Sequence, residues 1–264
     1  MEHVTIIEKV REDSYKIIGD VERDYAHDNN LSHVTVIGVP FVYDGDSPEI
    51  ILHNNYFKAV AKLKHRKDIT EEERIKKLAK LPKISLNVAP AGHCCPDDSL
   101  EYVTESFLFE NLRKEMSEEC YVKTDKDNPQ AVKLEKWEYA EKEYARPIGG
   151  AEGYEYGVPY DCPLFVPIPI GFAEHKADGN VEHSYVFALP FSTEEYNSLL
   201  LADDVDGLEH HLLLPHEKCP ISELKDDGSL LDAITRLFFN PDNKKVLDRL
   251  MEVIDEYCKR KKKV

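Results

Sequence analysis

Long apolar runs are missing from the sequence, since no stretch approaches the roughly 18 consecutive apolar residues that a membrane-spanning helix needs. The start, MEHVTIIEKVRED, also lacks the basic and then apolar order of a secretory signal peptide. Basic residues are in the minority, with 34 Lys and Arg against 51 Asp and Glu and a formal net charge of −17. A field of this sign repels phosphate polymers and anionic membrane surfaces. We therefore expect a cytoplasmic protein whose partner is neither a membrane nor a nucleic acid.

Short-spaced cysteine pairs are absent as well. The six cysteines include the adjacent Cys94 and Cys95 but no CxxC, which is unlike the disulfide framework of a small secreted domain. The sequence therefore predicts free thiols. His93-Cys94-Cys95 and His216-x-x-Cys219 each supply only half of a structural zinc site, and because no second short-spaced pair is evident, the sequence does not favour such a site.

Two signatures of nucleotide binding are also missing. No GxGxxG follows a predicted strand, which disfavours a doubly wound dinucleotide-binding fold. The Gly/Tyr/Pro-rich stretch 146–163 lacks the GK[ST] of a P-loop, so we interpret it as a loop that flanks a binding cleft. Any nucleotide must then be held by metal ions or by a few placed cations.

The chain does contain a mixture of strand-like and helical segments. Strands are predicted within 33–56 (two runs joined by a turn at 44–48) and at 83–93, 164–172 and 181–191. Helices are predicted at 68–81, from about 99 or 104 to 119, and at 133–145, 229–239 and 243–260. A length of 264 residues with 42% hydrophobic content is enough for a sizeable core. This order of elements predicts an α/β protein in which a mixed sheet carries helices on its faces.

The segment LRKEMSEEC (112–120) places several charges on one of the predicted helices. Helical periodicity puts two sets of side chains on adjoining arcs, the apolar Phe109, Leu112, Met116 and Cys120 and the acidic Glu115, Glu118 and Glu119. Like charges at these spacings repel one another, and Lys114 alone does not balance them. A solvated acidic face is one interpretation. The other is a site for Mg²⁺, which binds carboxylates and phosphate oxygens together.

Three short motifs taken together resemble the signature of the Nudix hydrolase family. They are Ala91-Gly92-His93, Pro96-Asp97-Asp98 and the segment 112–120. The family pattern ends in Arg-Glu-apolar-x-Glu-Glu-x-Gly-apolar, and residues 114–122 fill that half. Gly171-Phe172 and Val181-Glu182-His183 look similar to a strand pair of a bacterial MutT-type phosphoesterase subgroup. The resemblance covers roughly residues 34–225.

Three positions depart from the family pattern. Lys114 stands where the family has arginine, and Tyr121 stands where it has the glycine that ends the helix. The earlier glutamate of the pattern has no clear equivalent, because strict spacing reaches Ser106.

The resemblance implies a Nudix-like α/β/α sandwich with a mixed sheet. We expect a single domain over 1–264, with an insertion at about 126–163 and additional C-terminal helices at about 229–260. The implied activity is metal-dependent hydrolysis of a pyrophosphate bond in a nucleoside diphosphate linked to another group, with Mg²⁺ or Mn²⁺ as cofactor. The expected partner is thus a small-molecule nucleoside diphosphate derivative, and the oligomeric state is left open, with a homodimer as one option.

The resemblance also assigns site residues. Glu115, Glu118 and Glu119 are the expected metal ligands, with Glu115 and Glu119 also catalytic. Glu223 is a candidate catalytic base, whose alternative interpretation is a helix-capping acid. Gly92, His93 and His183 are the expected substrate-binding residues, although either histidine could simply pack against its neighbours.

Two other functions stay open. The departures at Lys114 and Tyr121 and the missing glutamate favour a Nudix-fold protein that binds or senses a nucleotide without hydrolysing it. An isoprenoid diphosphate isomerase shares the general fold, but it would need a catalytic cysteine and a metal-binding set of histidines.

Overall fold

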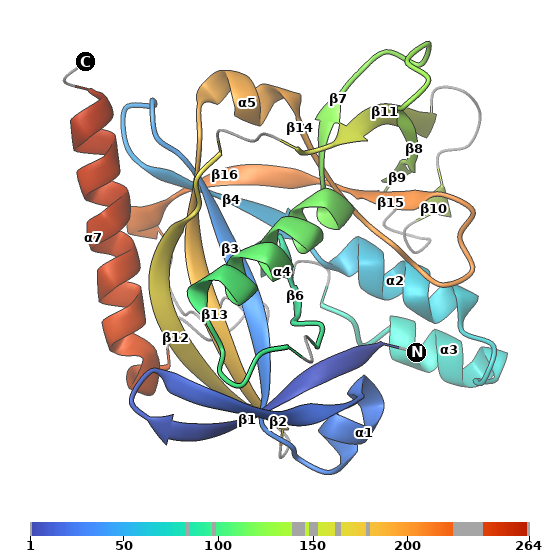
Figure 1. The fold of residues 1–264 in the computed structure, drawn as a ribbon. Helices are drawn as coiled ribbons and strands as arrows, with labels where there is room; N and C mark the ends of the chain where they lie inside the picture. Colours follow the sequence, from blue (N-terminus) through green and yellow to red (C-terminus); the bar gives the residue numbers. More distant parts are fainter. Residues whose placement is uncertain are drawn as a thin grey trace.

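The computed structural model describes residues 2–82, 85–96, 99–138, 146–147, 153–161, 165–177, 180–223 and 240–262. Its strands are β1 (His3–Arg11), β2 (Ser14–Glu22), β3 (His33–Val42), β4 (Glu49–Asn54), β5 (Leu86–Asn87), β6 (Ala91–His93), β7 (Cys120–Lys123), β8 (Val132–Glu135), β9 (Trp137–Glu138), β10 (Arg146–Pro147), β11 (Tyr154–Pro159), β12 (Ile168–Ala177), β13 (Asn180–Phe191), β14 (Leu199–Asp203), β15 (His211–Leu214) and β16 (His216–Pro220). Its helices are α1 (Arg23–Asp28), α2 (Tyr56–His65), α3 (Glu71–Leu78), α4 (Glu105–Glu119), α5 (Thr193–Ser198) and α7 (Lys244–Lys261), with 3₁₀ turns η2 (Ile221–Glu223) and η3 (Pro241–Asn243). The protein is thus a mixed α/β protein (Figure 1).

The strand β3 is the centre of a nine-stranded sheet. It pairs in parallel with β13, from His33 beside Glu182 to Val42 beside Phe191, and antiparallel with β1, β4 and β6. All of its residues are buried, as expected for a strand that is covered on both faces. The predicted mixed sheet is therefore confirmed.

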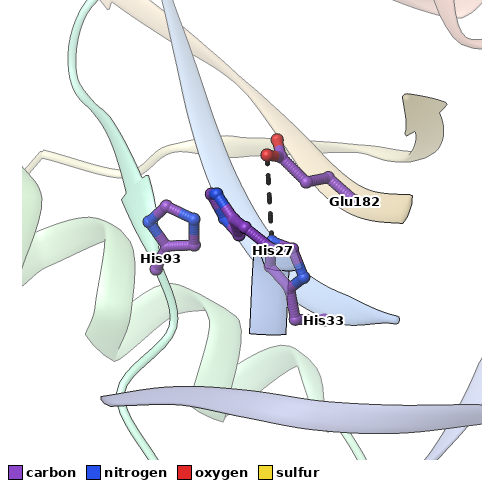
Figure 2. A group of neighbouring side chains, drawn as sticks. All are labelled: His27, His33, His93 and Glu182. Carbon is purple, nitrogen blue, oxygen red and sulfur yellow. Dashed lines mark ion pairs between the residues drawn. The ribbon is translucent and has the colours of Figure 1, made fainter. Parts of the chain in front are cut away.

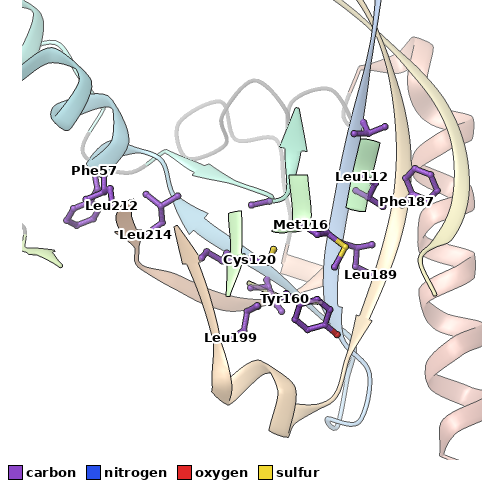
Figure 3. Packing of buried hydrophobic residues seen from close by; sticks show 14 of the residues in the cluster. Phe57, Leu112, Met116, Cys120, Tyr160, Phe187, Leu189, Leu199, Leu212 and Leu214 are labelled. Carbon is purple, nitrogen blue, oxygen red and sulfur yellow. The ribbon is translucent and has the colours of Figure 1, made fainter. Parts of the chain in front are cut away.

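Different helices cover the two faces of this sheet. On one face, Leu112 and Met116 of α4 share a hydrophobic cluster with Val36 of β3 (Figure 3). On the other face, Leu250 and Ile254 of α7 share a cluster with alternate β3 residues, Ile37, Val39 and Phe41. Each such side chain contributes about 1.5–3 kcal/mol when it is fully buried. In Figure 1, α4 crosses the sheet while α7 runs along β12. Alternation along β3 thus holds α4 and α7 on opposite faces.

A small closed barrel is attached to the end of α4. Its strands follow the order β11, β7, β14, β15 and β8. The helix ends at Glu119 and the next residue, Cys120, already has the extended φ of −112° and ψ of 131°. Tyr121 then lies buried in the barrel, and its hydroxyl donates a hydrogen bond of 3.1 Å to the carbonyl oxygen of Glu118. The chain therefore leaves the helix directly into a strand, and this exit needs no left-handed glycine.

Most predicted elements with a clear hydrophobic period are confirmed. The paired runs within 33–56 are β3 and β4, and the strands at 164–172 and 181–191 are β12 and β13, which pair antiparallel. The helices predicted at 68–81, 104–119 and 243–260 correspond to α3, α4 and α7. The strand at 83–93 is divided into β5 and β6. The helix predicted at 229–239 lies outside the described residues.

The helix predicted at 133–145 is wrong in its described part, and one predicted loop is partly a strand. Residues 132–135 and 137–138 form β8 and β9, because Leu134 is fully buried in the barrel and β8 pairs with β11, whereas residues 139–145 lie outside the described residues. The stretch 146–163 contains that strand, β11. In both places tertiary packing decides the structure, and at 133–138 it overrides a lysine- and glutamate-rich pattern that suits a helix.

The cysteines agree with a further expectation. Cys94, Cys95, Cys120, Cys219 and Cys258 are free thiols, whereas Cys162 lies outside the described residues. Among the helices of the described ranges, none is both long enough and apolar enough to cross a membrane.

Candidate functional site

A cavity of about 920 Å³ opens beside the C-terminal half of α4. The helix is anchored at its start by Thr104, whose hydroxyl oxygen accepts a hydrogen bond of 3.2 Å from the amide of Phe107. The apolar side chains of α4 pack on the sheet. The adjoining acidic arc, Glu115, Glu118 and Glu119, therefore faces the cavity. The acidic and neighbouring residues that line it include Glu115, Glu118, Glu119, Gly92, His93, Glu182 and Asp203. The cavity therefore gathers chain segments that lie far apart in the sequence.

Glu119 is the most tightly held of these carboxylates. Its side chain accepts a hydrogen bond of 3.0 Å from the amide of Ala91 in β6. Burial, followed by the negative charge of Asp203, raises the pKa of Glu119 to about 8, although Lys58 acts in the opposite direction. Lys58 forms an ion pair with Asp203. A positive ion beside Glu119 would therefore be stabilised strongly.

Glu115 lies directly against the backbone of Gly92. A Cβ atom added at Gly92 would come within 2.2 Å of the Glu115 carboxyl carbon and of one carboxylate oxygen. Glycine at this position therefore makes room for the carboxylate. Burial, followed by the charge of Glu118, raises the pKa of Glu115 to about 7. Two residues that the resemblance selected, Gly92 and Glu115, therefore lie in direct contact.

Glu118 and Lys114 lie farther toward solvent. The Glu118 side chain is 55% exposed, and its carboxylate is 3.9 Å from the Lys114 ammonium. That ammonium also donates a hydrogen bond of 2.9 Å to the Cys95 sulfur. Lys114 therefore connects α4 to the loop after β6. Glu118 is more exposed to solvent than Glu115 and Glu119.

These raised pKa values predict a particular dependence of stability on pH. Between the ordinary pKa of 4.5 and the folded-state pKa of about 8, folded Glu119 holds a proton that the unfolded chain has released. The free energy of unfolding of the metal-free protein should therefore fall as pH rises through this window, by up to a few kcal/mol, at about 1.4 kcal/mol per pKa unit. Denaturant unfolding in EDTA at pH 5 and pH 8.5 measures it. Glu119→Gln should lose much of this slope, and parallel pH profiles for variant and wild type would contradict the prediction.

Three histidines and a glutamate form a second group at the cavity (Figure 2). His27 comes from α1, His33 begins β3, His93 ends β6 and Glu182 lies near the start of β13. One potential ligand atom from each lies within 4.8 Å of the others. The ring centroid of His33 lies 5.1 Å from that of His27 and 5.3 Å from that of His93. Nitrogen and carboxylate ligands at this density are typical of metal sites.

The environment of this group differs from that of ordinary packed histidines. The Nε2 atoms of His27, His33 and His93 are buried and have no hydrogen-bond partner. One Nε2 atom, that of His33, lies 3.8 Å from a Glu182 carboxylate oxygen. Burial alone would raise the pKa of Glu182, but the neighbouring imidazoles of His33 and His93 lower it to about 2. The carboxylate is therefore held ionised beside the three rings.

The two groups meet at the short strand β6. Gly92 pairs with Val36 and His93 pairs with Thr35. Because successive residues of a strand point to opposite faces, Gly92 faces α4 and the Glu115 carboxylate, whereas His93 faces the histidine group. Consecutive Cα atoms are only about 3.8 Å apart. Two groups, one of carboxylates and one mainly of imidazoles, are therefore adjacent, and His93 and Glu182 of the second group line the cavity.

One predicted site residue, His183, is placed elsewhere, and for Glu223 the structure describes only its place in the chain. His183 is buried, with its ring centroid 4.8 Å from that of Tyr15, and it is not among the described residues that line the cavity. Its Nδ1 is 3.8 Å from a Glu174 carboxylate oxygen. Glu223 ends η2, directly before residues 224–239, which lie outside the described part of the chain.

Sequence reasoning missed several residues of the cavity. Those that line it include Glu2, Lys58, Glu182 and Asp203, and the neighbouring histidine group adds His27 and His33. The sequence did contain a signal for His27 and His33, because these two histidines lie six positions apart on either side of a short turn. Glu182 was one position from the histidine that the resemblance selected. Neither potential half zinc site, at His93-Cys94-Cys95 or His216-x-x-Cys219, is present as a cluster in the described residues.

Comparison with known proteins adds no family assignment. The chain matches no protein-family model, and no curated protein gives a significant match.

Proposed function

We propose that the protein is a metal-dependent phosphohydrolase that cleaves a pyrophosphate bond in a nucleoside diphosphate linked to another group. The observation that carries this proposal is the pair of desolvated carboxylates, Glu115 and Glu119, on the cavity side of α4. Two carboxylates that are costly to ionise without a cation suit a hard divalent ion such as Mg²⁺ or Mn²⁺. The space kept by Gly92 supports the same assignment.

Cationic side chains of the cavity suit a diphosphate. Arg23, Lys58, Lys62 and Lys114 all line it, in a chain whose net charge is −17. They would attract and orient the phosphate groups against the overall negative field. We therefore expect the negative charge of the substrate to be concentrated in its central phosphate groups and not in the two groups that they link.

In this proposal, different residues bind the metal, position its ligands and accept the proton. Glu115, Glu119 and the more exposed Glu118 would hold the metal, which supplies charge neutralisation on the phosphate oxygens. The Ala91 amide fixes one oxygen of Glu119 and so limits its rotation. The general base stays unassigned between Glu223 and the carboxylates of α4.

The fold arrangement is consistent with this activity. The sheet carries α4 on one face and α7 on the other, and we propose that this is a Nudix-type α/β/α sandwich with the barrel as an addition.

A substrate panel tests the proposal. We would measure phosphate release, after phosphatase treatment of the products, from nucleoside diphosphate sugars, dinucleoside polyphosphates, NAD-type dinucleotides and nucleoside triphosphates, with Mg²⁺, Mn²⁺ or EDTA. Release from one class that EDTA abolishes is the expected result. No release from any class, together with tight nucleotide binding, would replace the hydrolase by the binding protein.

A second candidate function is the isomerisation of an isoprenoid diphosphate. The histidine group favours it, because such an enzyme needs a metal-binding set of histidines. It also needs a catalytic cysteine, and the described residues that line the cavity include none. Cys94 is fully buried and Cys95 contacts Lys114. Incubation with isopentenyl diphosphate separates the two functions, since an isomerase conserves the diphosphate and a hydrolase does not.

A further inference from the structure

We propose that His27, His33, His93 and Glu182 bind one transition metal ion of the Zn²⁺ class, and that this ion fastens α1 to the central sheet. The site is separate from the carboxylates of α4, and the inference does not depend on the proposed hydrolysis.

The unpartnered ring nitrogens are the first argument. Buried polar atoms nearly always have a hydrogen-bond partner, and leaving one without a partner costs about 1–3 kcal/mol. Here three Nε2 atoms, from His27, His33 and His93, are buried without one, and their rings lie side by side. A single ion bound by all three would satisfy them together.

The other nitrogens of two rings have suitable partners. The Nδ1 of His33 lies 2.9 Å from the Leu31 carbonyl oxygen, which can only accept, so this nitrogen carries the hydrogen. The Nδ1 of His93 lies 3.3 Å from a Glu2 carboxylate oxygen. A neutral imidazole with its hydrogen on Nδ1 presents a lone pair on Nε2. Metal-bound histidines usually have such carbonyl or carboxylate partners behind them.

The ligand types select the class of metal. Three imidazoles with one carboxylate suit Zn²⁺ and related transition ions, whereas Mg²⁺ prefers oxygen ligands alone. Zn–N bonds of about 2.1 Å place tetrahedral ligands roughly 3.4 Å apart. The group, whose atoms lie within 4.8 Å of one another, therefore needs only a modest contraction to enclose an ion.

Three of the four proposed ligands lie on paired strands of the sheet, and the fourth, His27, does not. His33 and Glu182 are direct neighbours in the sheet, and His93 pairs with the adjoining position of β3, Thr35. His27 comes instead from the short helix α1, which reaches β3 through a turn with a left-handed residue, Asn30, at a φ of 55°. Binding therefore adds a link between α1 and three strands that are already held together.

Zinc binding by the whole protein tests the inference. We would strip the protein with chelator, dialyse it against buffered Zn²⁺ in excess Mg²⁺, and measure bound zinc, unfolding temperature and hydrogen exchange of the α1 amides. About one zinc per chain, a higher unfolding temperature and slower exchange in α1 are expected. A wild-type chain that binds no zinc, or binds it without slowing exchange in α1, would overturn the inference.

Three variants locate the ion. His27→Asn should weaken zinc binding at least about a hundredfold. The matched control is His175→Asn, because His175 lines the same cavity outside the group, and this variant should bind zinc as wild type does. Glu115→Gln should also keep zinc while it loses Mg²⁺-dependent turnover, so failure of the zinc site and failure of the proposed hydrolysis give different results. Equal zinc affinity in His27→Asn and wild type would contradict the assignment.

Discussion

Glu119→Gln should lower Mg²⁺-dependent turnover by at least about a hundredfold while the protein stays folded, because it removes a metal-bound charge but little volume. The Ala91 amide can still donate to the remaining carbonyl oxygen of the glutamine side chain. The neutral side chain also removes the cost of ionising a buried carboxyl, so metal-free stability at pH 8 should not fall. Steady-state kinetics and thermal unfolding of the same preparation measure both effects.

The control for this prediction is Glu110→Gln on the same helix. Glu110 is exposed and is not among the described residues that line the cavity of α4 and β6. The same chemical change there should leave turnover within about twofold of wild type, since exposed substitutions away from a site have small effects. Near-normal activity in Glu119→Gln would remove this residue from the proposed machinery.

Gly92→Ala should reduce turnover by about a hundredfold, since misplacing a reacting group by about 1 Å can cost that much. The new methyl group would lie 2.2 Å from the Glu115 carboxyl carbon, which no real pair of atoms tolerates, so the carboxylate must move. The loss should appear together with a weaker dependence on Mg²⁺, because the displaced group is a proposed ligand. A titration of turnover against Mg²⁺ concentration measures this directly.

Gly45→Ala is the matched control for the glycine. A Cβ at Gly45 would meet its nearest atom at 3.5 Å, which is ordinary contact, in the turn between β3 and β4. Turnover and Mg²⁺ dependence should match those of the wild type. Wild-type behaviour in Gly92→Ala as well would mean that Glu115 does not act from its position against Gly92.

The sequence predicted the elements whose side chains follow a clear period. The continuous apolar run of His33–Val42 and the stripe on α4 both correspond to buried residues, because a strand covered on both faces and a helix packed on one face impose these two patterns. The segment 132–138 has no such independent signal. Its charges suit a helix, and pairing of β8 with β11 and with the distant β15 makes it a strand. Long-range pairing of this kind is not encoded in a local pattern.

The candidate site was predictable to the extent that it lies within one helix. Glu115 and Glu119 share a face through their spacing alone, and the resemblance added Gly92. The histidine group could not be found in that way, because its members come from α1, β3, β6 and β13 and meet only through the sheet register. Their positions in the sequence span more than half of the chain.

Binding of Mn²⁺ to the carboxylates of α4 tests the central claim most directly. Free Mn²⁺ can be followed by its electron paramagnetic resonance signal during titration of the zinc-loaded protein, in which the histidine group is already filled. The account predicts saturable Mn²⁺ binding by the wild type and its loss in the double variant Glu115→Gln, Glu119→Gln. Equal Mn²⁺ binding by the two proteins would show that the carboxylates of α4 hold no metal, and the proposed hydrolytic site would fall.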